Sequence, residues 1–142
     1  MEKSAKIFIV DDDLFTLNLY RQTIENLGFE NISLFLDGSV CLNNLQQKPS
    51  LIFLDHNMGD LSGFEVLKKI KRFDPNIYVV IVSAQENMHI AIDALKYGAF
   101  DYIIKGDNEL EKMQMVIDRI DLIEEELKKS KPSILQKILS IF

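Results

Sequence analysis

The sequence is poor in the features that mark secreted and membrane-spanning chains. Cys41 is the single cysteine among 142 residues, so no disulfide can form within the chain. Because the N-terminus also lacks a signal-type segment, we expect a reducing, cytoplasmic location. No apolar run approaches the roughly 20 residues needed to cross a bilayer, so we expect no membrane insertion.

Basic residues are also scarce relative to acidic ones. Lys and Arg number 16 against 22 Asp and Glu, which gives a formal net charge of −6. Such an acidic chain repels the phosphate backbone of nucleic acids, so direct nucleic-acid binding is not expected. No helix-turn-helix, basic domain or enzymatic unit is visible after residue 130.

The chain instead alternates short apolar runs with amphipathic stretches, which is typical of parallel β/α proteins. We expect strands at 6–10, 31–36, 51–54, 77–82 and 102–104. Helices are predicted at 14–27, 40–47, 62–73, 87–97 and 108–129. The predicted fold class is therefore α/β, a doubly wound five-stranded parallel sheet in three layers.

Local signals mark several helix ends. Asp13 is interpreted as the N-cap of the first helix, and Ser62-x-x-Glu65 is a capping box at the start of the third. Gly28 and Gly98 stand where a glycine commonly ends a helix.

Polar side chains follow the apolar strands at the point where each strand ends. Asp11 and Asp12 follow the first strand, Asp55 the third, Ser83 the fourth and Lys105 the fifth. Because the carboxyl ends of parallel strands meet at one edge of a sheet, we expect these side chains to gather there. Three carboxylates at that edge would repel one another unless a cation joined them, and an all-oxygen set favours Mg²⁺.

The same residues suit phosphoryl transfer, in which catalysis is mostly positioning and charge neutralisation. Lys105 would place a compact positive charge against one phosphoryl oxygen, and Ser83 could donate a hydrogen bond to another. Asp55 is the best candidate for the nucleophile, because it stands alone at the tip of the most apolar strand and carboxylates are established phosphoryl acceptors. His56 beside it is interpreted as a loop histidine.

Together these residues resemble the receiver domains of two-component response regulators. The resemblance covers about residues 5 to 129. Its matching elements, all in order at compatible spacing, are Val10-Asp11-Asp12, Leu54-Asp55-His56-Asn57-Met58, Ser83-Ala84, Gly98-Ala99 and Tyr102-Ile103-Ile104-Lys105. The strand order expected on this basis is the flavodoxin-like 2-1-3-4-5.

The resemblance implies that Asp55 accepts a phosphoryl group from the phosphohistidine of a sensor histidine kinase or a phosphotransfer protein. Mg²⁺ would be held by Asp12, Asp55 and the backbone carbonyl of Asn57, with Asp11 acting through water. Such a protein is a phosphoacceptor in signal transduction, not an enzyme, and supports only its own phosphorylation and dephosphorylation.

The resemblance also implies a conformational switch. Ser83 and Lys105 would contact the phosphoryl oxygens, Ser83 would move inward on phosphorylation, and Tyr102 would swing into the vacated space. The face formed by the fourth helix, fifth strand and fifth helix would then change shape and meet a downstream protein. Tyr102 as a plain core residue is an equal alternative.

Two glycines depart from the family pattern. Gly59 and Gly106 stand where receivers commonly have proline, after the methionine of the third loop and after the lysine. Because glycine does not fix its backbone angles, we expect looser loops with the chemistry retained. Gln85, two residues past Ser83, could affect the water that hydrolyses an aspartyl phosphate.

The C-terminus is predicted to form a separate segment. We expect a receiver domain at 1–129 and a short amphipathic tail at 130–142, with a break at 131–133. A helix this short must dock on something, and a second subunit is one candidate, which would make a homodimer. Its apolar face would hold Ile134, Leu135, Ile138, Leu139 and Phe142.

Three other readings stay open on the sequence. The chain could be the receiver fragment of a longer regulator or hybrid kinase. It could be a Mg²⁺-dependent phosphohydrolase with an aspartyl nucleophile, although no insertion is long enough to form the substrate-enclosing cap of such enzymes. It could also be a phosphorylation-independent scaffold, for which Asp55→Asn would change nothing in the cell.

Overall fold

The computed structural model describes the backbone of residues 1–59, 61–84 and 86–141. Within the last helix it does not describe the side chains of residues 130–137 and 140. The expectations for Gln85, for Phe142 and for the side chains of Ile134 and Leu135 therefore lie outside the described residues.

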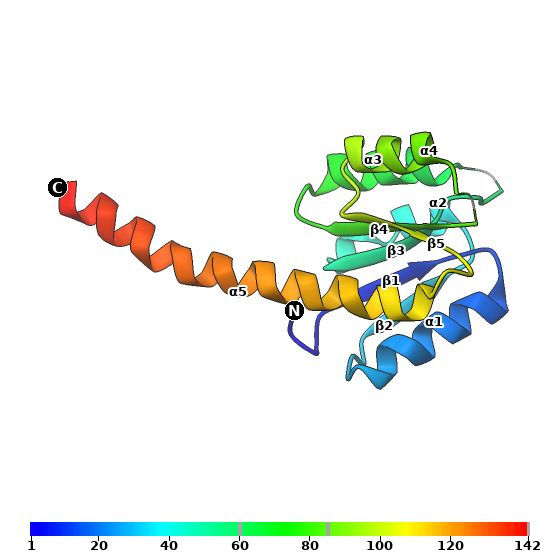
Figure 1. Ribbon diagram of the computed structural model, residues 1–142, viewed down its shortest axis with the longest axis horizontal. Coiled ribbons are helices and arrows are strands. Elements are labelled where there is room, and N and C mark those ends of the chain that lie inside the picture. The colour runs from blue at the N-terminus through cyan, green and yellow to red at the C-terminus, as the bar shows by residue number, and fades with distance from the viewer. Residues whose placement is uncertain (60, 85, 142) are drawn as a thin grey trace.

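The chain folds into a parallel five-stranded sheet between two helical layers (Figure 1). The strands are β1 (Ile7–Val10), β2 (Ile32–Phe35), β3 (Leu51–Asp55), β4 (Tyr78–Ser83) and β5 (Asp101–Ile104). Their order is β2-β1-β3-β4-β5, which confirms the predicted topology. The helices are α1 (Leu14–Asn26), α2 (Gly38–Leu42), α3 (Gly63–Phe73), α4 (Met88–Lys96) and α5 (Glu109–Ile141), with a short 3₁₀ helix at Leu45–Gln47.

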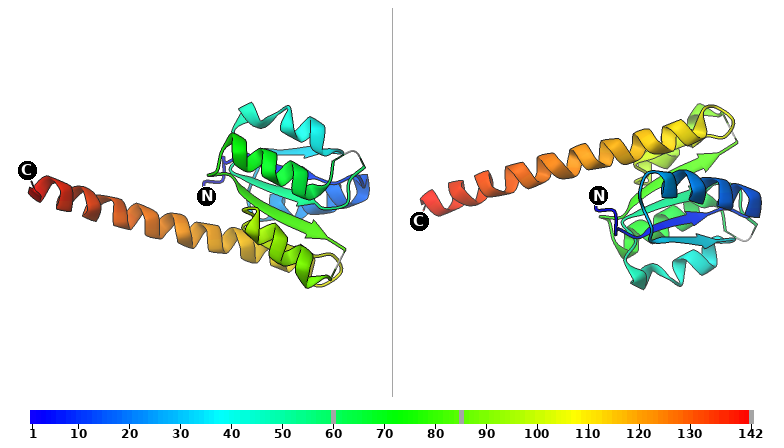
Figure 2. Two further views of the ribbon diagram at one scale, coloured as in Figure 1. Left: turned by 90° about the horizontal axis from the view of Figure 1, so that it is seen from above. Right: turned by 90° about the horizontal axis from the view of Figure 1, so that it is seen from below.

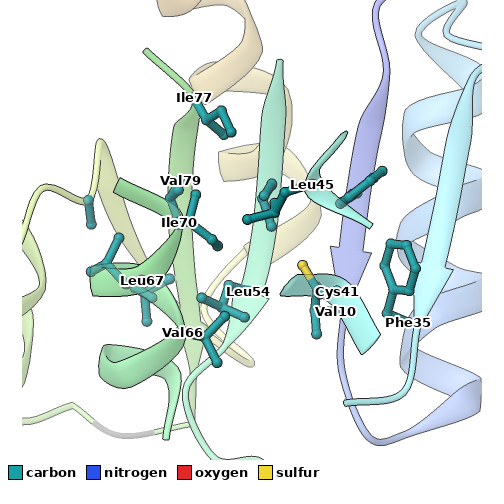
Figure 3. Packing of buried hydrophobic residues seen from close by; sticks show 14 of the residues in the cluster. Val10, Phe35, Cys41, Leu45, Leu54, Val66, Leu67, Ile70, Ile77 and Val79 are labelled. Atoms are coloured by element: carbon teal, nitrogen blue, oxygen red, sulfur yellow. The ribbon is translucent and has the colours of Figure 1, made fainter. Parts of the chain in front are cut away.

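Both faces of the sheet are covered, which explains why its central strands are apolar throughout. Successive residues of a strand point to opposite faces, so Ile52 packs with α2, α3 and α4 while Phe53 packs with α1 and α5. Figure 3 shows part of the first cluster, where Val66 of α3 lies beside Leu54 of β3 and Ile70 of α3 beside Val79 of β4. This rigid apolar sheet fixes the positions at which the strands end.

The predicted caps are present. The side chain of Asp13 accepts a hydrogen bond from the Thr16 N–H, and that of Ser62 accepts one from the Glu65 N–H. Gly98 follows α4 with φ of +104°, a left-handed conformation that favours glycine.

The second predicted helix is shorter than expected. The sequence predicts one helix over 40–47, whereas α2 ends at Leu42 and a separate 3₁₀ helix follows. The Asn44 side chain donates to the Val40 carbonyl at 2.7 Å, so it competes with the backbone for a helical acceptor. Asp37 caps the helix earlier than predicted by accepting from the Val40 N–H at 2.8 Å.

The predicted break at 131–133 is wrong. α5 runs continuously for 33 residues, about 50 Å at 1.5 Å per residue, and projects far past the sheet (Figures 1 and 2). Pro132 removes one helical hydrogen bond but need not end a helix, and the strong helix formers of 124–129 precede it. Among the described residues, no helix combines the length and the apolar character required to span a membrane.

Candidate functional site

Three carboxylates meet at the carboxyl edge of the sheet. Val10 of β1 pairs with Leu54 of β3, so Asp11 and Asp55 leave adjacent strands at the same level. One carboxylate oxygen from each of Asp11, Asp12 and Asp55 lies within 4.8 Å of the others. Asp11 and Asp55 are 1% and 4% exposed, whereas Asp12 is exposed. The acidic cluster predicted from the strand ends is therefore formed, with two members buried and one open to solvent.

Lys105 spans the two buried carboxylates. Its Nζ lies 2.8 Å from Asp11 Oδ2 and 3.3 Å from Asp55 Oδ1. Burial acts to lower the pKa of Lys105, but its hydrogen bond to Asp11 and the charge of Asp55 outweigh burial and raise it. The lysine is therefore a fixed positive charge at the centre of the site.

The negative charge of Asp55 is disfavoured in the folded protein, even though Lys105 lies beside it. Burial, followed by the charge of Asp11, raises its pKa from 3.8 to about 6. The charge of Lys105 and a backbone hydrogen bond from Asn57 oppose that rise. A divalent cation would relieve the repulsion, and three carboxylates form an all-oxygen donor set of the kind that Mg²⁺ takes.

Ser83 and Tyr102 lie near this edge on the neighbouring strands. Ser83 is the last residue of β4, is fully buried, and accepts the Lys105 N–H at its carbonyl at 2.8 Å. Val82, the preceding residue, pairs with Asp55. Tyr102 of β5 is half-buried against the apolar cluster on the α3 and α4 face. Their roles in phosphoryl contact and switching stay predictions.

His56 packs against the first turn of α3. Its ring centroid lies 4.4 Å from that of Phe64, and burial lowers its pKa. Gly63 allows this approach, because a Cβ at that position would lie 2.7 Å from the His56 Cα. Among the described residues, His56 Nδ1 is a buried nitrogen with no hydrogen-bond partner. These contacts support the interpretation of His56 as a loop residue.

One set of residues next to the site was not singled out from the sequence. Glu109, the first residue of α5, accepts the Gly106 N–H at Oε1 at 3.2 Å and the Tyr20 hydroxyl at Oε2. A tyrosine on the buried face of a predicted helix usually needs a hydrogen-bond partner, and this was the available signal. The sequence did not reveal that the partner would be Glu109, which is far away in the chain.

The fold is the one found in response regulator receiver domains. The model of that family matches residues 7–118, so the chain belongs to the family, whose members are signalling domains. The match does not favour the phosphohydrolase reading.

Proteins of known name and solved structures are similar to this chain. The transcriptional regulatory protein ZraR of Klebsiella oxytoca is 33% identical over 116 residues, which are 81% of this chain and 26% of that protein. The chain thus spans about a quarter of that relative's length. The chemotaxis protein CheY of Listeria monocytogenes is 30% identical over 113 residues, 77% of this chain and 95% of that protein. A CheX–CheY–BeF₃–Mg²⁺ complex from Borrelia burgdorferi has a chain with a TM-score of 0.74 and 27% identity, over 82% of this chain and 88% of that chain.

Proposed function

We propose that Asp55 is the phosphoacceptor of this receiver and takes a phosphoryl group from a phosphohistidine. The observation that carries the proposal is the placement of Lys105 Nζ between Asp11 and Asp55, within a cluster of three carboxylates. A buried carboxylate beside a fixed cation, at the carboxyl edge of a doubly wound sheet, is suited to receive an anionic group.

The reaction is a displacement at phosphorus. An Asp55 carboxylate oxygen attacks, the bond between phosphorus and the imidazole nitrogen breaks with its electron pair left on that nitrogen, and an acyl phosphate forms. Lys105 is close enough to shift its ion pair from Asp55 to a phosphoryl oxygen, and Ser83 would donate to another. Neutralising these oxygens stabilises the transition state.

Asp11, Asp12 and Asp55 fit a Mg²⁺ site, and the Asn57 backbone carbonyl would complete the protein ligands. We assign Asp12 and Asp55 as direct ligands and Asp11 as a ligand through water. When bound, Mg²⁺ supplies positive charge that offsets the charge developing on the phosphoryl group. The Borrelia burgdorferi relative, whose complex is titled with BeF₃ and Mg²⁺, supports this assignment.

The proposed partners follow from the same likeness. A sensor histidine kinase or phosphotransfer protein would deliver the phosphoryl group in the cytoplasm, and a downstream protein would contact the face of α4, β5 and α5. That face lies on helices with several exposed apolar side chains, namely Met88, Ile92 and Leu95 of α4 and Met115 of α5. The projecting part of α5 is a candidate contact for a second copy, because Ile138, Leu139 and Ile141 on it are exposed.

Phosphorylation by acetyl phosphate tests the proposal. Intact mass after incubation with acetyl phosphate and Mg²⁺ should show one added phosphoryl group on the wild type and none on Asp55→Asn. Asp13→Asn is the matched control, because Asp13 caps α1 outside the cluster and asparagine is an equally good cap. Unmodified wild type that also fails to bind beryllofluoride would refute the assignment.

A further inference from the structure

The loop that follows Lys105 has an unusual backbone. Gly106 has φ of +84° and Asn108 has φ of +52°, so two of the four residues between β5 and α5 are left-handed. Apart from its two chain neighbours, no described residue has an atom within 4 Å of where a Gly106 Cβ would be, so packing at this position does not fix the loop. Something else must hold the peptide next to the lysine of the site.

Hydrogen bonds hold the backbone on both sides of Lys105, and a longer one from the Asp107 N–H to the Ile104 carbonyl, at 3.4 Å, closes the turn over Lys105 and Gly106. The Lys105 N–H donates to the Ser83 carbonyl at 2.8 Å, which anchors the lysine on β4. The Gly106 N–H donates to Glu109 Oε1 at 3.2 Å, which anchors the other side of the same residue. A proline at 106 could give neither this N–H nor this φ, so the second anchor would be lost with the proline that receivers commonly carry there.

Glu109 is itself held by the core. Its second oxygen accepts the hydroxyl of Tyr20, which is 2% exposed and packs with α1, α5 and the sheet. Burial, and then the hydrogen bond to Glu109, raise the pKa of Tyr20, so the phenol remains a donor. The carboxylate therefore ties the loop after Lys105 to a rigid side chain of α1.

We propose that Glu109 is a positioning residue that holds Lys105 in place for the phosphoryl group through its bonds to Gly106 and Tyr20. This inference rests on the proposed function, because it concerns the contact of Lys105 with phosphoryl oxygens. Without Glu109 the peptide after Lys105 can turn, and the ammonium group samples positions away from Asp11 and Asp55. Phosphoryl binding then weakens, while Mg²⁺ binding persists because Lys105 is not a metal ligand.

A double-mutant cycle between Glu109 and Lys105 tests the proposal. The readouts are beryllofluoride affinity at saturating Mg²⁺, followed by ¹⁹F NMR, and the initial rate of phosphorylation by acetyl phosphate. Glu109→Ala should lower both by about tenfold, since a small misplacement of a catalytic group is costly. In a Lys105→Ala background the same change should cost less than about twofold, because the residue it positions is gone.

Matched variants separate positioning from general damage. Glu111→Ala removes an exposed carboxylate from the same helical turn and should leave both readouts unchanged. Glu109→Gln retains an acceptor for Gly106 and should retain most of the activity. Mg²⁺ affinity should stay within about twofold in all three variants, which a loss of the whole site would not allow.

The outcomes are distinguishable. If the wild type neither binds beryllofluoride nor becomes phosphorylated, the proposed function fails and this inference falls with it. If the wild type responds but Glu109→Ala matches it, or loses the same factor in both backgrounds, the positioning role alone is refuted. Should Glu109→Ala fail to fold, Tyr20→Phe replaces it, because it keeps the core ring and removes only the hydroxyl. A loss of beryllofluoride affinity and phosphorylation rate that occurs when Lys105 is present, but not in Lys105→Ala, would then support the positioning role, and an equal loss in both would refute it.

Discussion

Replacing Asp55 by asparagine should make the metal-free protein more stable at neutral pH, although it removes the proposed phosphoacceptor. The reason is the raised pKa of this carboxyl, about 6 in the folded protein against 3.8 for an ordinary aspartate. Burial and the Asp11 charge disfavour the ionised form, and Lys105 compensates for only part of that cost. Asparagine has the same shape and no charge to bury.

The sign and size follow from proton linkage. An acid whose pKa is higher in the folded state favours folding while it is protonated, so its contribution is fully present below about pH 4 and is lost as the pH rises to about 6. At about 1.4 kcal/mol for each unit of pKa difference, Asp55→Asn should gain about 3 kcal/mol at pH 7 and about 1 kcal/mol near pH 4.5.

Urea unfolding at several pH values, with EDTA present, measures this gain directly. Asp12→Asn is the matched control, because Asp12 belongs to the same cluster but is exposed, and its change should stay within about 0.5 kcal/mol. Saturating Mg²⁺ should stabilise the wild type and shrink its deficit relative to Asp55→Asn. A stability gain that is absent at pH 7, or that does not decline towards pH 4.5, would refute the electrostatic account of the site.

Other features of the fold give further predictions. Burial raises the pKa of the Cys41 thiol to about 12, so Ellman's reagent should label the native protein only after denaturant is added. Gly63→Ala would place a Cβ 2.7 Å from the His56 backbone and should cost about 2 kcal/mol or more in urea unfolding. Gly59→Ala should cost less than about 1 kcal/mol, because no described residue beyond its chain neighbours has an atom within 4 Å of the new Cβ. Removing residues 130–142, where α5 projects past the sheet, should change the free energy of unfolding of the 1–129 domain by less than about 1 kcal/mol, as measured by the same method.

The architecture was readable from the sequence because the strands are short, apolar and followed by polar residues. A strand buried on both faces has no polar positions, so 51–54 could not be confused with a surface element. The doubly wound topology then brings the ends of β1, β3 and β5 to one edge, which is why the sequence alone places Asp11, Asp55 and Lys105 together.

Helix ends were harder to predict because they depend on weak local competition. The Asn44 side chain takes a helical carbonyl and shortens α2, and a single proline at 132 fails to end α5. Each of these effects is worth about 1–3 kcal/mol, comparable to the propensities that oppose it, so sequence pattern alone does not decide the outcome.

The loop after Lys105 shows most clearly where prediction from the sequence ends. Glycine at 106 predicts a looser loop, because glycine leaves its backbone angles free where proline would set them. In the structure the Gly106 N–H donates to Glu109, which in turn accepts the hydroxyl of Tyr20, 89 residues earlier in the chain. Glycine in place of proline removes the constraint on φ, but it also adds a backbone N–H, which an acceptor distant in the sequence can bind once the chain has folded. Whether such a loop is loose or rigid is therefore decided by tertiary contacts, and the Glu109 and Lys105 variants measure which holds in solution.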